Sequence, residues 1–351
     1  MSQILFVSPA AFAALHQRHQ SFASELAKLG HQVTFLDPVK TGGYSCKIRA
    51  VGDNLKIAQL RVPFKSVSHP AIQMLTARFA LMLLKEKLKI TPAGTILWIS
   101  EPSLAWLARH RWQTIIYDRC DLHGSFPGQH KEAWQRYEEL LFARASLISC
   151  SHSYLQNTLP ENARQKSVLA GNASADVFFG NSRRQITDND RLKLVSAGAH
   201  HEWVDTGWLQ MLGAHDGLEL HLAGTGRGKG YEKLKQQPGV VDHGRLNQSE
   251  LAKLLKSCDI GLVPFCDIEL IRGVDPIKVY EYAASGLQVW APAVAALRDN
   301  ALINRFIVTP DDIEKAISDK AGQTQCERPA IARWSERLQT ILDRLDDLQS
   351  D

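Results

Sequence analysis

One stretch indicates the architecture of the chain most clearly: Gly273-Val-Asp-Pro-Ile-Lys-Val-Tyr-Glu-Tyr-Ala-Ala-Ser-Gly286. We expect a helix over residues 276–285, because Asp275 is a good N-cap, Pro276 suits the first helical position and Gly286 suits a left-handed stop. The apolar run at residues 260–265 precedes this stretch and is expected to be a short strand. A strand that leads through a loop into a helix is the repeating unit of an open α/β sheet.

The start of this helix is the first candidate ligand site. Where a strand ends and a helix begins, unpaired backbone N–H groups and the helix dipole favour anionic ligands. Lys278 lies in the first turn, where a cation interacts unfavourably with the helix dipole. A bound diphosphate that pairs with Lys278 would offset this cost. Lys278, Glu281 and Tyr282 share one helix face, and together they can hold a phosphate and a sugar or ribose hydroxyl. On spacing alone, a surface Lys–Glu pair is an equal alternative.

Length, charge and cysteine content narrow the class of protein. The 351 residues exceed what one core usually supports, so we expect two domains. No charged leader with an apolar segment occupies residues 2–30 and no run approaches the ~18 apolar residues of a membrane span, so we expect a cytoplasmic protein. Six scattered cysteines without a CxxC pair favour reduced thiols over zinc or disulfides. Residues 1–150 carry 18 Lys and Arg against 10 Asp and Glu, which predicts an anionic partner for the first half.

The first half begins as a parallel sheet covered by helices. A strand is expected at residues 3–8, then a helix ending before Gly30, then a strand at residues 32–37. The first loop contains no GxGxxG, which argues against an ordinary dinucleotide site. His16 and Arg18 lie early in the helix, where Arg18 could reach an acceptor phosphate. A solvated helix face is the alternative for this polar group.

A basic region follows over residues 40–89. Residues 40–65 look turn-rich, and residues 70–90 read as a helix with apolar residues such as Phe79 and Leu83 along one side and several basic residues. A basic helix with a wide apolar face can lie on an anionic membrane, or it can be an ordinary helix that covers a sheet. Nucleic acid is the weakest of the anionic partners, because no aromatic residues alternate with the basic ones.

A cluster of acids with a histidine follows one of the next strands. Strands are expected at residues 95–100, 114–118 and 146–150. Asp118, Asp121 and His123 come at the carboxyl end of the second of these, in a loop with Gly and Pro. Ligands and catalytic groups gather at that edge of an open α/β sheet, so we expect chemistry here. The alternative is a turn that contains Asp because turns favour Asp.

A second α/β domain follows a looser segment. Residues 171–190 read as a linker, and Asp188 and Asp190 within it form a DxD pattern that we interpret as a solvated turn without metal. Strands are expected at residues 192–198 and 218–226. The glycine-rich run at residues 224–230 lacks the Lys-Ser/Thr ending of a P-loop, and no clean helix is expected after it. Residues 247–250 form a capping box, and residues 330–348 an amphipathic helix long enough to reach back to the first domain.

Together these motifs resemble the GT-B glycosyltransferases that build bacterial exopolysaccharides. The resemblance rests on five segments, at residues 17–19, 24–33, 116–121, 258–265 and above all 276–286. The chain is similar in pattern to the group that includes the xanthan glucuronosyltransferase and to teichuronic-acid-type enzymes of the large GT4 family. The similarity extends from residue 3 to about residue 345. The segment at 276–286 is fairly specific to GT-B enzymes, and the earlier ones are weaker.

The resemblance implies a GT-B fold of two Rossmann-like parallel-sheet domains. An acceptor-binding domain would cover residues 1–172, a linker residues 173–190, and a nucleotide-sugar-binding domain residues 191–333. The last segment, residues 334–351, would be a helix that packs back on the first domain. The implied activity is transfer of a sugar, with glucuronate as one candidate, from a UDP-linked donor to a hydroxyl of a lipid-linked saccharide. The protein would work at the inner face of the cytoplasmic membrane and need neither metal nor cofactor.

The resemblance also implies roles for individual residues. Asp121 would be the base that deprotonates the acceptor, supported by Asp118 and His123, and Arg18 and His16 would bind the acceptor. Lys278 would bind the donor diphosphate and Glu281 the donor hydroxyls. The remaining donor-binding residues would be Pro276, Tyr282, Phe265 and Arg272.

One departure from the family pattern bears on stereochemistry. Retaining GT4 enzymes carry an acidic residue eight positions before the Glu that matches Glu281, and this chain has Gly273 there. The loss favours an inverting enzyme. Two rival functions fit the same scaffold: a nucleotide-sugar epimerase, which would not need a basic lipid-facing region, and a non-catalytic glycan-binding relative, which would be expected to lose Lys278 or the Asp121 loop.

Overall fold

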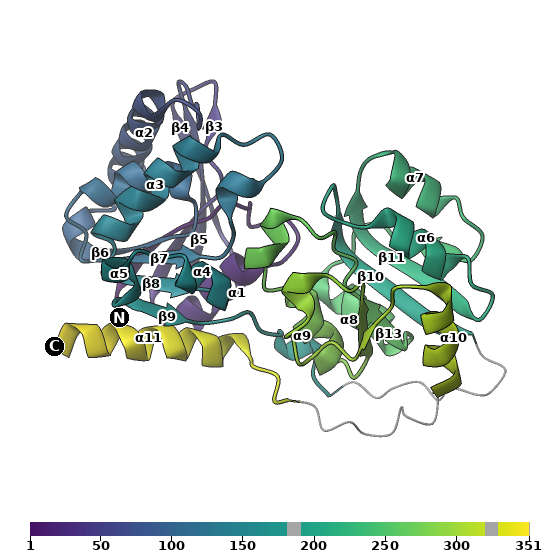
Figure 1. Cartoon of the computed structure of the whole chain (residues 1–351). Coiled ribbons are helices and arrows are strands. Elements are labelled where there is room, and N and C mark those ends of the chain that lie inside the picture. Colours follow the sequence, from purple (N-terminus) through teal and green to yellow (C-terminus); the bar gives the residue numbers. More distant parts are fainter. Residues whose placement is uncertain (181–190, 320–328, 351) are drawn as a thin grey trace. The chain divides into compact units, whose positions relative to one another are not determined.

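The structure is a computed structural model that describes residues 1–180, 191–319 and 329–350. The chain divides into two units (Figure 1). The first unit comprises Met1–Gly171, Gly273–Asp275 and the segment that begins at Trp334, and the second comprises Asn172–Arg272 and Pro276–Arg333. Asp188, Asp190 and the rest of the expected linker from residue 181 onward lie outside the described residues, as does Cys326.

The first unit is built on one sheet whose described strands run in the order β3-β5-β2-β1-β6-β7-β8-β9. Neighbouring strands in this order are parallel, and β4 pairs with β5 in the antiparallel sense. The strands are β1 (Gln3–Val7), β2 (Gln32–Leu36), β3 (Lys40–Thr41), β4 (Ser45–Ala50), β5 (Leu55–Val62), β6 (Thr95–Ile99), β7 (Thr114–Arg119), β8 (Leu147–Cys150) and β9 (Ser167–Leu169). The prediction of a parallel α/β sheet beginning at residue 3 is confirmed.

Helices cover both faces of this sheet. The helical elements are α1 (Arg18–Lys28), α2 (Pro70–Leu88), η1 (Pro92–Gly94), η2 (Pro102–Arg109), η3 (His123–Ser125), α3 (Lys131–Arg144), α4 (Ser153–Asn157), α5 (Glu161–Arg164) and α11 (Trp334–Ser350). Leu5 and Val7 of β1 join the core that contains α2, η2 and α3. Phe6 points to the opposite face, where its ring stacks between Phe35 and Trp98. Both faces are apolar because helices cover both, as in parallel sheets generally.

The C-terminal helix α11 belongs to the first unit. Trp334 at its first turn is buried and meets the ring of Phe22 on α1 edge to face, with ring centroids 5.4 Å apart. Leu338, Ile341 and Leu345 continue the buried stripe at helical spacing. Figure 1 shows α11 running beside β9.

The basic region contains strands where we expected turns. The prediction of a turn-rich segment over residues 40–65 is wrong, because β3, β4 and β5 lie there. Buried and exposed residues alternate along most of β5, with Lys56 and Arg61 at exposed positions and Leu60 and Val62 at buried ones. The basic side chains therefore occupy the solvent face of a strand, and their number hid the period of two in the apolar residues.

The second unit contains a smaller sheet, all of whose described strand pairs are parallel. The order is β12-β11-β10-β13-β14-β15. The strands are β10 (Leu192–His200), β11 (Leu218–Gly226), β12 (Val240–Asp242), β13 (Ile260–Leu262), β14 (Gln288–Ala291) and β15 (Arg305–Phe306). The helical elements are η4 (Asp176–Phe178), α6 (Thr206–Gly213), α7 (Lys229–Lys235), α8 (Gln248–Lys256), η5 (Glu269–Gly273), α9 (Ile277–Ala284), η6 (Ala295–Leu297) and α10 (Pro310–Ser318).

Two local predictions for the second unit meet different outcomes. The capping box at residues 247–250 is confirmed, since Asn247 Oδ1 accepts from the N–H of Glu250 and Glu250 Oε2 accepts from the N–H of Asn247. The expectation that no helix follows the glycine-rich run is wrong, because α7 begins at Lys229. A seven-residue helix rich in lysine has too few apolar residues to show a clear helical pattern in the sequence.

Candidate functional site

A buried ion pair lies at the carboxyl edge of the first sheet. Asp118 on β7 accepts hydrogen bonds from Arg18 Nε at 3.0 Å and from Arg18 Nη2 at 2.8 Å. Ser100 Oγ also donates to Asp118, at 3.3 Å. Burial opposes the charge on Arg18, but the carboxylate of Asp118 outweighs it and raises the pKa of the guanidinium. The guanidinium of Arg18 is therefore held in its charged form by Asp118.

The remaining donors of Arg18 also serve the first unit. Nη1 donates to the carbonyl of Ala170 at 2.7 Å and to that of Gly171 at 3.1 Å, and Nη2 donates to Ser149 Oγ at 2.9 Å. The guanidinium also lies over the ring of Phe22. This geometry corrects the expectation that Arg18 reaches an acceptor phosphate, because the side chain is buried and bound to the protein. Nearby, His16 is half-buried with Nε2 3.0 Å from Ser21 Oγ.

Asp121 stands apart from this pair. Asp118 is fully buried, whereas Asp121 keeps partial exposure in the loop after β7. Loss of solvation raises the pKa of Asp121, and the charge of His123 acts in the opposite direction. A carboxylate with a raised pKa is a stronger base than an ordinary surface aspartate. Of the two acids predicted in this loop, Asp121 is therefore the one that can meet a ligand and take its proton.

Two buried histidines flank Asp121. His123 stacks on Trp134 with centroids 5.1 Å apart, and its Nε2 has no hydrogen-bond partner among the described residues. His19 Nε2 lies 3.9 Å from the sulfur of Cys120, and its Nδ1 likewise has no partner in the described part of the chain. Burial lowers the pKa of His19 to about 4, so its ring is neutral near pH 7. We had not predicted His19, although it adjoins Arg18 in the polar group at the start of α1.

Lys278 and Glu281 form the centre of the second candidate region. They lie on α9, whose N-terminus is at the carboxyl edge of the second sheet, and Lys278 Nζ donates to Glu281 Oε2. Lys278 is 26% exposed and Glu281 is 3% exposed, so one end of the pair is open to solvent. Glu281 thus holds a lysine whose side chain remains partly exposed to solvent.

The start of α9 differs from the prediction in one detail. The helix begins at Ile277, Pro276 occupies the N-cap position, and no side chain of the described residues caps it. Asp275, expected as the cap, is buried and belongs to the first unit. The predicted stop is confirmed, because Gly286 has a φ of +84°, a left-handed conformation that favours glycine. With no side-chain cap, N–H groups at the start of α9 can donate hydrogen bonds to an anion.

Tyr282 does not belong to the exposed part of this region. It is fully buried, and its hydroxyl oxygen accepts from the N–H of Ala197 at 2.8 Å. A side chain on Gly261 would come within 2.2 Å of the Tyr282 ring, so the ring fills the space beside β13. The expectation that Tyr282 binds a donor is therefore corrected, and the residue holds β10 and β13 in place.

The other expected donor residues surround the loop between β13 and α9. Phe265 is partly buried and forms an isolated antiparallel bridge with Val204. Arg272 is exposed at the end of η5, and Pro276 supplies the backbone before the first turn of α9. The structure thus brings Phe265, Arg272, Pro276, Lys278 and Glu281 into one unit.

Close packing explains the glycines at residues 224–226. A Cβ on Gly224 would lie 1.9 Å from the carbonyl oxygen of Gly198 on the neighbouring strand. A Cβ on Gly226 would lie 2.5 Å from the ring of Tyr231. These positions need glycine for the approach of backbone and ring, which accounts for the resemblance to a phosphate loop without a phosphate.

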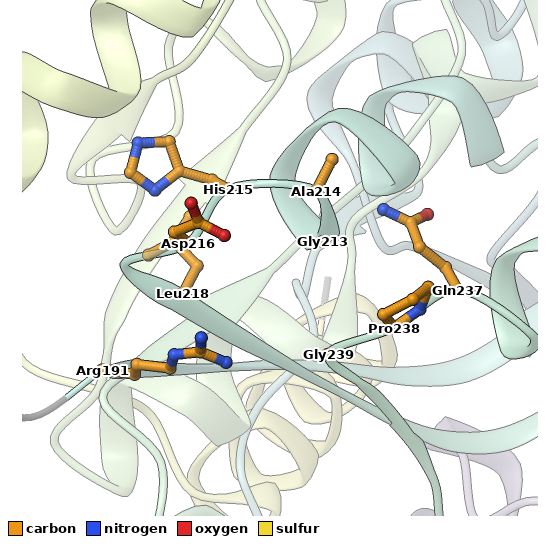
Figure 2. A pocket seen from close by; sticks show the side chains of 9 residues that line it. All are labelled: Arg191, Gly213, Ala214, His215, Asp216, Leu218, Gln237, Pro238 and Gly239. Atoms are coloured by element: carbon orange, nitrogen blue, oxygen red, sulfur yellow. The ribbon is translucent and has the colours of Figure 1, made fainter.

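A pocket lies at the opposite end of the second sheet. The cavity has a volume of about 340 Å³. Figure 2 shows the residues that line it: Arg191, Gly213, Ala214, His215, Asp216, Leu218, Gln237, Pro238 and Gly239. Arg191 precedes β10, and Leu218 and Gly239 lie at the starts of β11 and β12, so the pocket is at the amino edge of these strands. Ligands of open α/β sheets bind at the carboxyl edge, and this pocket is therefore distinct from the Lys278 region.

Neither a metal cluster nor a membrane-spanning helix is found among the described residues. Residues 1–180, 191–319 and 329–350 contain no group of three or more His, Cys, Asp or Glu side chains placed to hold a metal ion. In the same part of the chain, none of the helices has the length and apolar character needed to cross a bilayer.

Solved structures similar to this chain share a two-domain fold. Sucrose-phosphate synthase from Thermosynechococcus elongatus matches with a TM-score of 0.67 and 13% identity, over 99% of this chain and 95% of that one. HepE from Anabaena, in complex with UDP and glucose, matches with a TM-score of 0.61 and 12% identity, over 100% and 98%. A UDP-forming α,α-trehalose-phosphate synthase from Burkholderia xenovorans matches with a TM-score of 0.58 and 14% identity, over 99% and 96%.

These matches establish the class of fold. No family model matches the sequence, and a search of curated proteins finds no match. The structural matches extend over nearly the whole chain, and they are GT-B glycosyltransferases. The protein has the GT-B fold, with one parallel α/β sheet in each of its two units. At 12–14% identity the likeness defines the fold and leaves the substrates to be argued from the residues.

Proposed function

We propose that this chain is a glycosyltransferase that moves a hexose from a nucleotide-sugar to an acceptor hydroxyl. The observation that carries the proposal is the partly exposed side chain of Lys278 in the first turn of the uncapped helix α9. A cation beside a helix N-terminus neutralises a diphosphate, both when it is bound and when it leaves. UDP in the HepE structure and the UDP-forming activity named for the trehalose-phosphate synthase support a uridine nucleotide as the first choice.

The donor would bind at the second unit. Lys278 would leave Glu281 in part to contact the diphosphate, and Glu281 would then accept hydrogen bonds from sugar or ribose hydroxyls. Arg272 would add a second cation, and Phe265 and Pro276 would line the site. Tyr282 would act only by holding β10 and β13. The diphosphate needs no metal in this scheme, because Lys278 and the helix N-terminus supply the positive charge.

The acceptor would meet Asp121 in the first unit. Its hydroxyl oxygen would attack the anomeric carbon while its proton passes to the Asp121 carboxylate, and the bond from that carbon to the diphosphate oxygen would break. Asp118 would act only through Arg18 and the fold, and His123 would tune Asp121. Arg18 binds Asp118, so His16 is the remaining acceptor-binding candidate from the start of α1.

Inversion at the anomeric carbon is the favoured stereochemistry. Gly273 stands where retaining GT4 enzymes carry an acid. A Cβ on Gly273 would come within 2.8 Å of Leu155 Cδ2 and 3.1 Å of Leu122 Cγ, so a larger residue here would require these leucine side chains to shift. With no acid there, Asp121 acting as a base in a single displacement is the simplest mechanism.

The finer proposal concerns the biological substrate. We place the chain with the GT4-like enzymes of bacterial exopolysaccharide synthesis, acting on a lipid-linked saccharide at the inner membrane surface, with glucuronate as one candidate sugar. The support is the resemblance over residues 276–286 and the positive charge of residues 40–89. That region contains ten Lys and Arg residues but only two Asp and Glu residues. Such a region attracts anionic lipid by about 1 kcal/mol for each basic residue near the surface.

A thermal-shift screen of nucleotide diphosphates tests the donor site. UDP should raise the unfolding temperature of the second unit in proportion to its binding, because a ligand that binds only the folded state stabilises it by mass action. The Lys278→Ala variant is the matched control and should lose most of the shift. Stabilisation by GDP alone would indicate a guanosine-linked donor in place of a uridine-linked one. If none of the nucleoside diphosphates stabilises the protein, the proposal is contradicted.

A further inference from the structure

Helix α2 exposes methionine where a surface helix normally exposes polar residues. Its inner side is buried through residues such as Ala77, Leu81 and Leu84. On the outer side Met74 is 41% exposed and Met82 is 48% exposed, with the exposed Arg78 between them. Positions 74, 78 and 82 are four residues apart and lie along one stripe of the helix. A helix that only covers a sheet has no need of two methionines there.

An exposed aromatic cluster adjoins this stripe. The ring of Phe79 on α2 meets Tyr44 edge to face at 6.0 Å and Phe64 edge to face at 5.7 Å. Tyr44 is 44% exposed just before β4, and Phe64 is 42% exposed just after β5. Thr76 Oγ1 donates to the carbonyl of Phe64 at 3.0 Å, which ties this loop to the helix. We call Tyr44, Phe64, Met74, Phe79 and Met82 the docking face.

Cations surround the docking face. Arg78 and Lys85 are exposed on α2, and Arg61 on β5 is exposed and pairs with Ser45, next to Tyr44. Lys87 is near Cys46: burial raises the pKa of that thiol, and the charge of Lys87 lowers it in part. The same surface therefore offers apolar side chains and positive charge, drawn from α2, β4 and β5, which Figure 1 shows gathered with β3 in one part of the first unit.

An anionic bilayer surface fits both properties. Apolar side chains gain by leaving water for the acyl boundary, and Lys and Arg gain beside anionic headgroups. Acidic nucleic acid or a purely acidic protein surface would match the cations and leave Met74 and Met82 in water. Long basic side chains at the rim can keep their charges at headgroup level while their stems cover apolar surface.

We propose that the docking face inserts Met74, Met82 and its aromatic rings into the headgroup region of an anionic bilayer. Attachment through the first unit is then part apolar and part electrostatic, which deepens the membrane partner named in the proposed function. The inference needs no glycosyl transfer, and its test can fail while the proposed function stands.

Vesicle sedimentation with the full chain tests the inference. The probes are vesicles of phosphatidylglycerol mixed with phosphatidylcholine, and vesicles of phosphatidylcholine alone. The wild type should pellet with the anionic vesicles at low salt and retain part of its binding at high salt, because apolar insertion is not screened. The double variant Met74→Gln/Met82→Gln should partition about tenfold less and become fully salt-sensitive. Glutamine keeps the length and helix propensity of methionine.

A matched control removes apolar surface elsewhere. Leu29→Gln/Leu169→Gln changes two exposed leucines of the first unit that lie outside the docking face, and it should bind vesicles like the wild type. Unchanged thermal unfolding of both double variants would show that the fold is kept. Stabilisation by UDP, measured on the same preparations, reports the second unit separately and so separates failure of docking from failure of the proposed donor site.

Three results would overturn the inference. The first is equal binding of wild type and Met74→Gln/Met82→Gln. The second is equal binding of the wild type to neutral and anionic vesicles, which would remove the role of the cations. The third is a wild-type dimer in sedimentation velocity that Met74→Gln/Met82→Gln abolishes, with no vesicle binding by either, which would assign the docking face to a second copy of the chain.

Discussion

The carboxyl edges of the two sheets each carry an ion pair, and the two pairs differ in exposure. Arg18 and Asp118 in the first unit are 2% and 0% exposed, whereas Lys278 and Glu281 in the second are 26% and 3% exposed. Arg18 donates hydrogen bonds to Asp118, Ser149 and two backbone carbonyls. Lys278 donates to Glu281 and still faces solvent.

The difference separates a structural pair from a binding pair. A buried arginine with several protein acceptors ties the ends of β7, β8 and β9 together, and leaving either charge of the pair unpaired is costly. A lysine with one acceptor and open access can change partner when an anion arrives. Charge at a sheet edge is therefore weak evidence for a ligand until the exposure of the cation is known. The following variants test this distinction, in order of expected effect.

The largest effect is expected at Asp121, the accessible acid beside the buried pair. Asp121→Asn keeps the shape of the side chain and removes its basicity, so turnover should fall by about 10²–10⁴ while UDP binding persists. Burial raises the pKa of Asp121, so ionisation costs the folded state free energy near pH 7, and the neutral variant should be no less stable than the wild type. Steady-state kinetics and thermal unfolding measure both. Near-normal turnover would place the base elsewhere.

The second prediction removes the cation of the buried pair. Arg18→Met leaves the Asp118 carboxylate buried without a counter-charge and should lower the free energy of unfolding by about 3–5 kcal/mol. In Arg18→Met/Asp118→Leu no charge is left unpaired, so part of the loss should return. The carbonyls of Ala170 and Gly171 would still lack their donor, which limits the recovery. Urea unfolding of the full chain measures both variants, and wild-type stability of Arg18→Met would contradict a structural role.

These two residues show what the sequence cannot reveal. Asp118 and Asp121 are three residues apart, one at the end of β7 and one in the loop after it, and both were predicted to do chemistry. Asp118 is instead tied to Arg18, exactly one hundred positions away in the sequence, and no local pattern indicates a contact over that separation. The strand that carries Asp118 was predictable because Ile115, Ile116 and Tyr117 form an apolar run within it.

The third prediction concerns the exposed cation. Lys278→Ala should weaken UDP binding by about 1.5–3 kcal/mol, because a charge-assisted contact to phosphate is lost. It also leaves the buried Glu281 carboxylate without its partner, so the variant loses stability as well. Lys278→Ala/Glu281→Gln removes that unpaired charge and should regain the stability without regaining UDP affinity. Calorimetric titration and thermal unfolding separate the two effects, and unchanged UDP affinity in either variant would contradict the donor site.

The region around Lys278 was more predictable than the first edge, with one instructive failure. Helix start and stop depend on local residues, so α9 and its end at Gly286 followed from the sequence to within one or two positions. Spacing placed Lys278, Glu281 and Tyr282 on one face but could not tell how that face divides between core and solvent. Tyr282 turns inward to Ala197, and Lys278 turns outward.

The smallest expected effect is a shift in the pH dependence of the first edge. As a base, Asp121 must be ionised, so kcat/KM should fall as the pH drops through its pKa, which burial raises above that of an ordinary aspartate. A positive charge on His123 lowers the pKa of Asp121 and thus extends activity toward acid. His123→Gln removes that charge, and the acidic limb of the kcat/KM profile should move to higher pH.

The matched control is His130→Gln, which changes an exposed histidine on the same segment and should leave the acidic limb in place. If His123→Gln lowers kcat/KM equally at all pH values, His123 serves only to pack against Trp134, and the electrostatic link to Asp121 is contradicted.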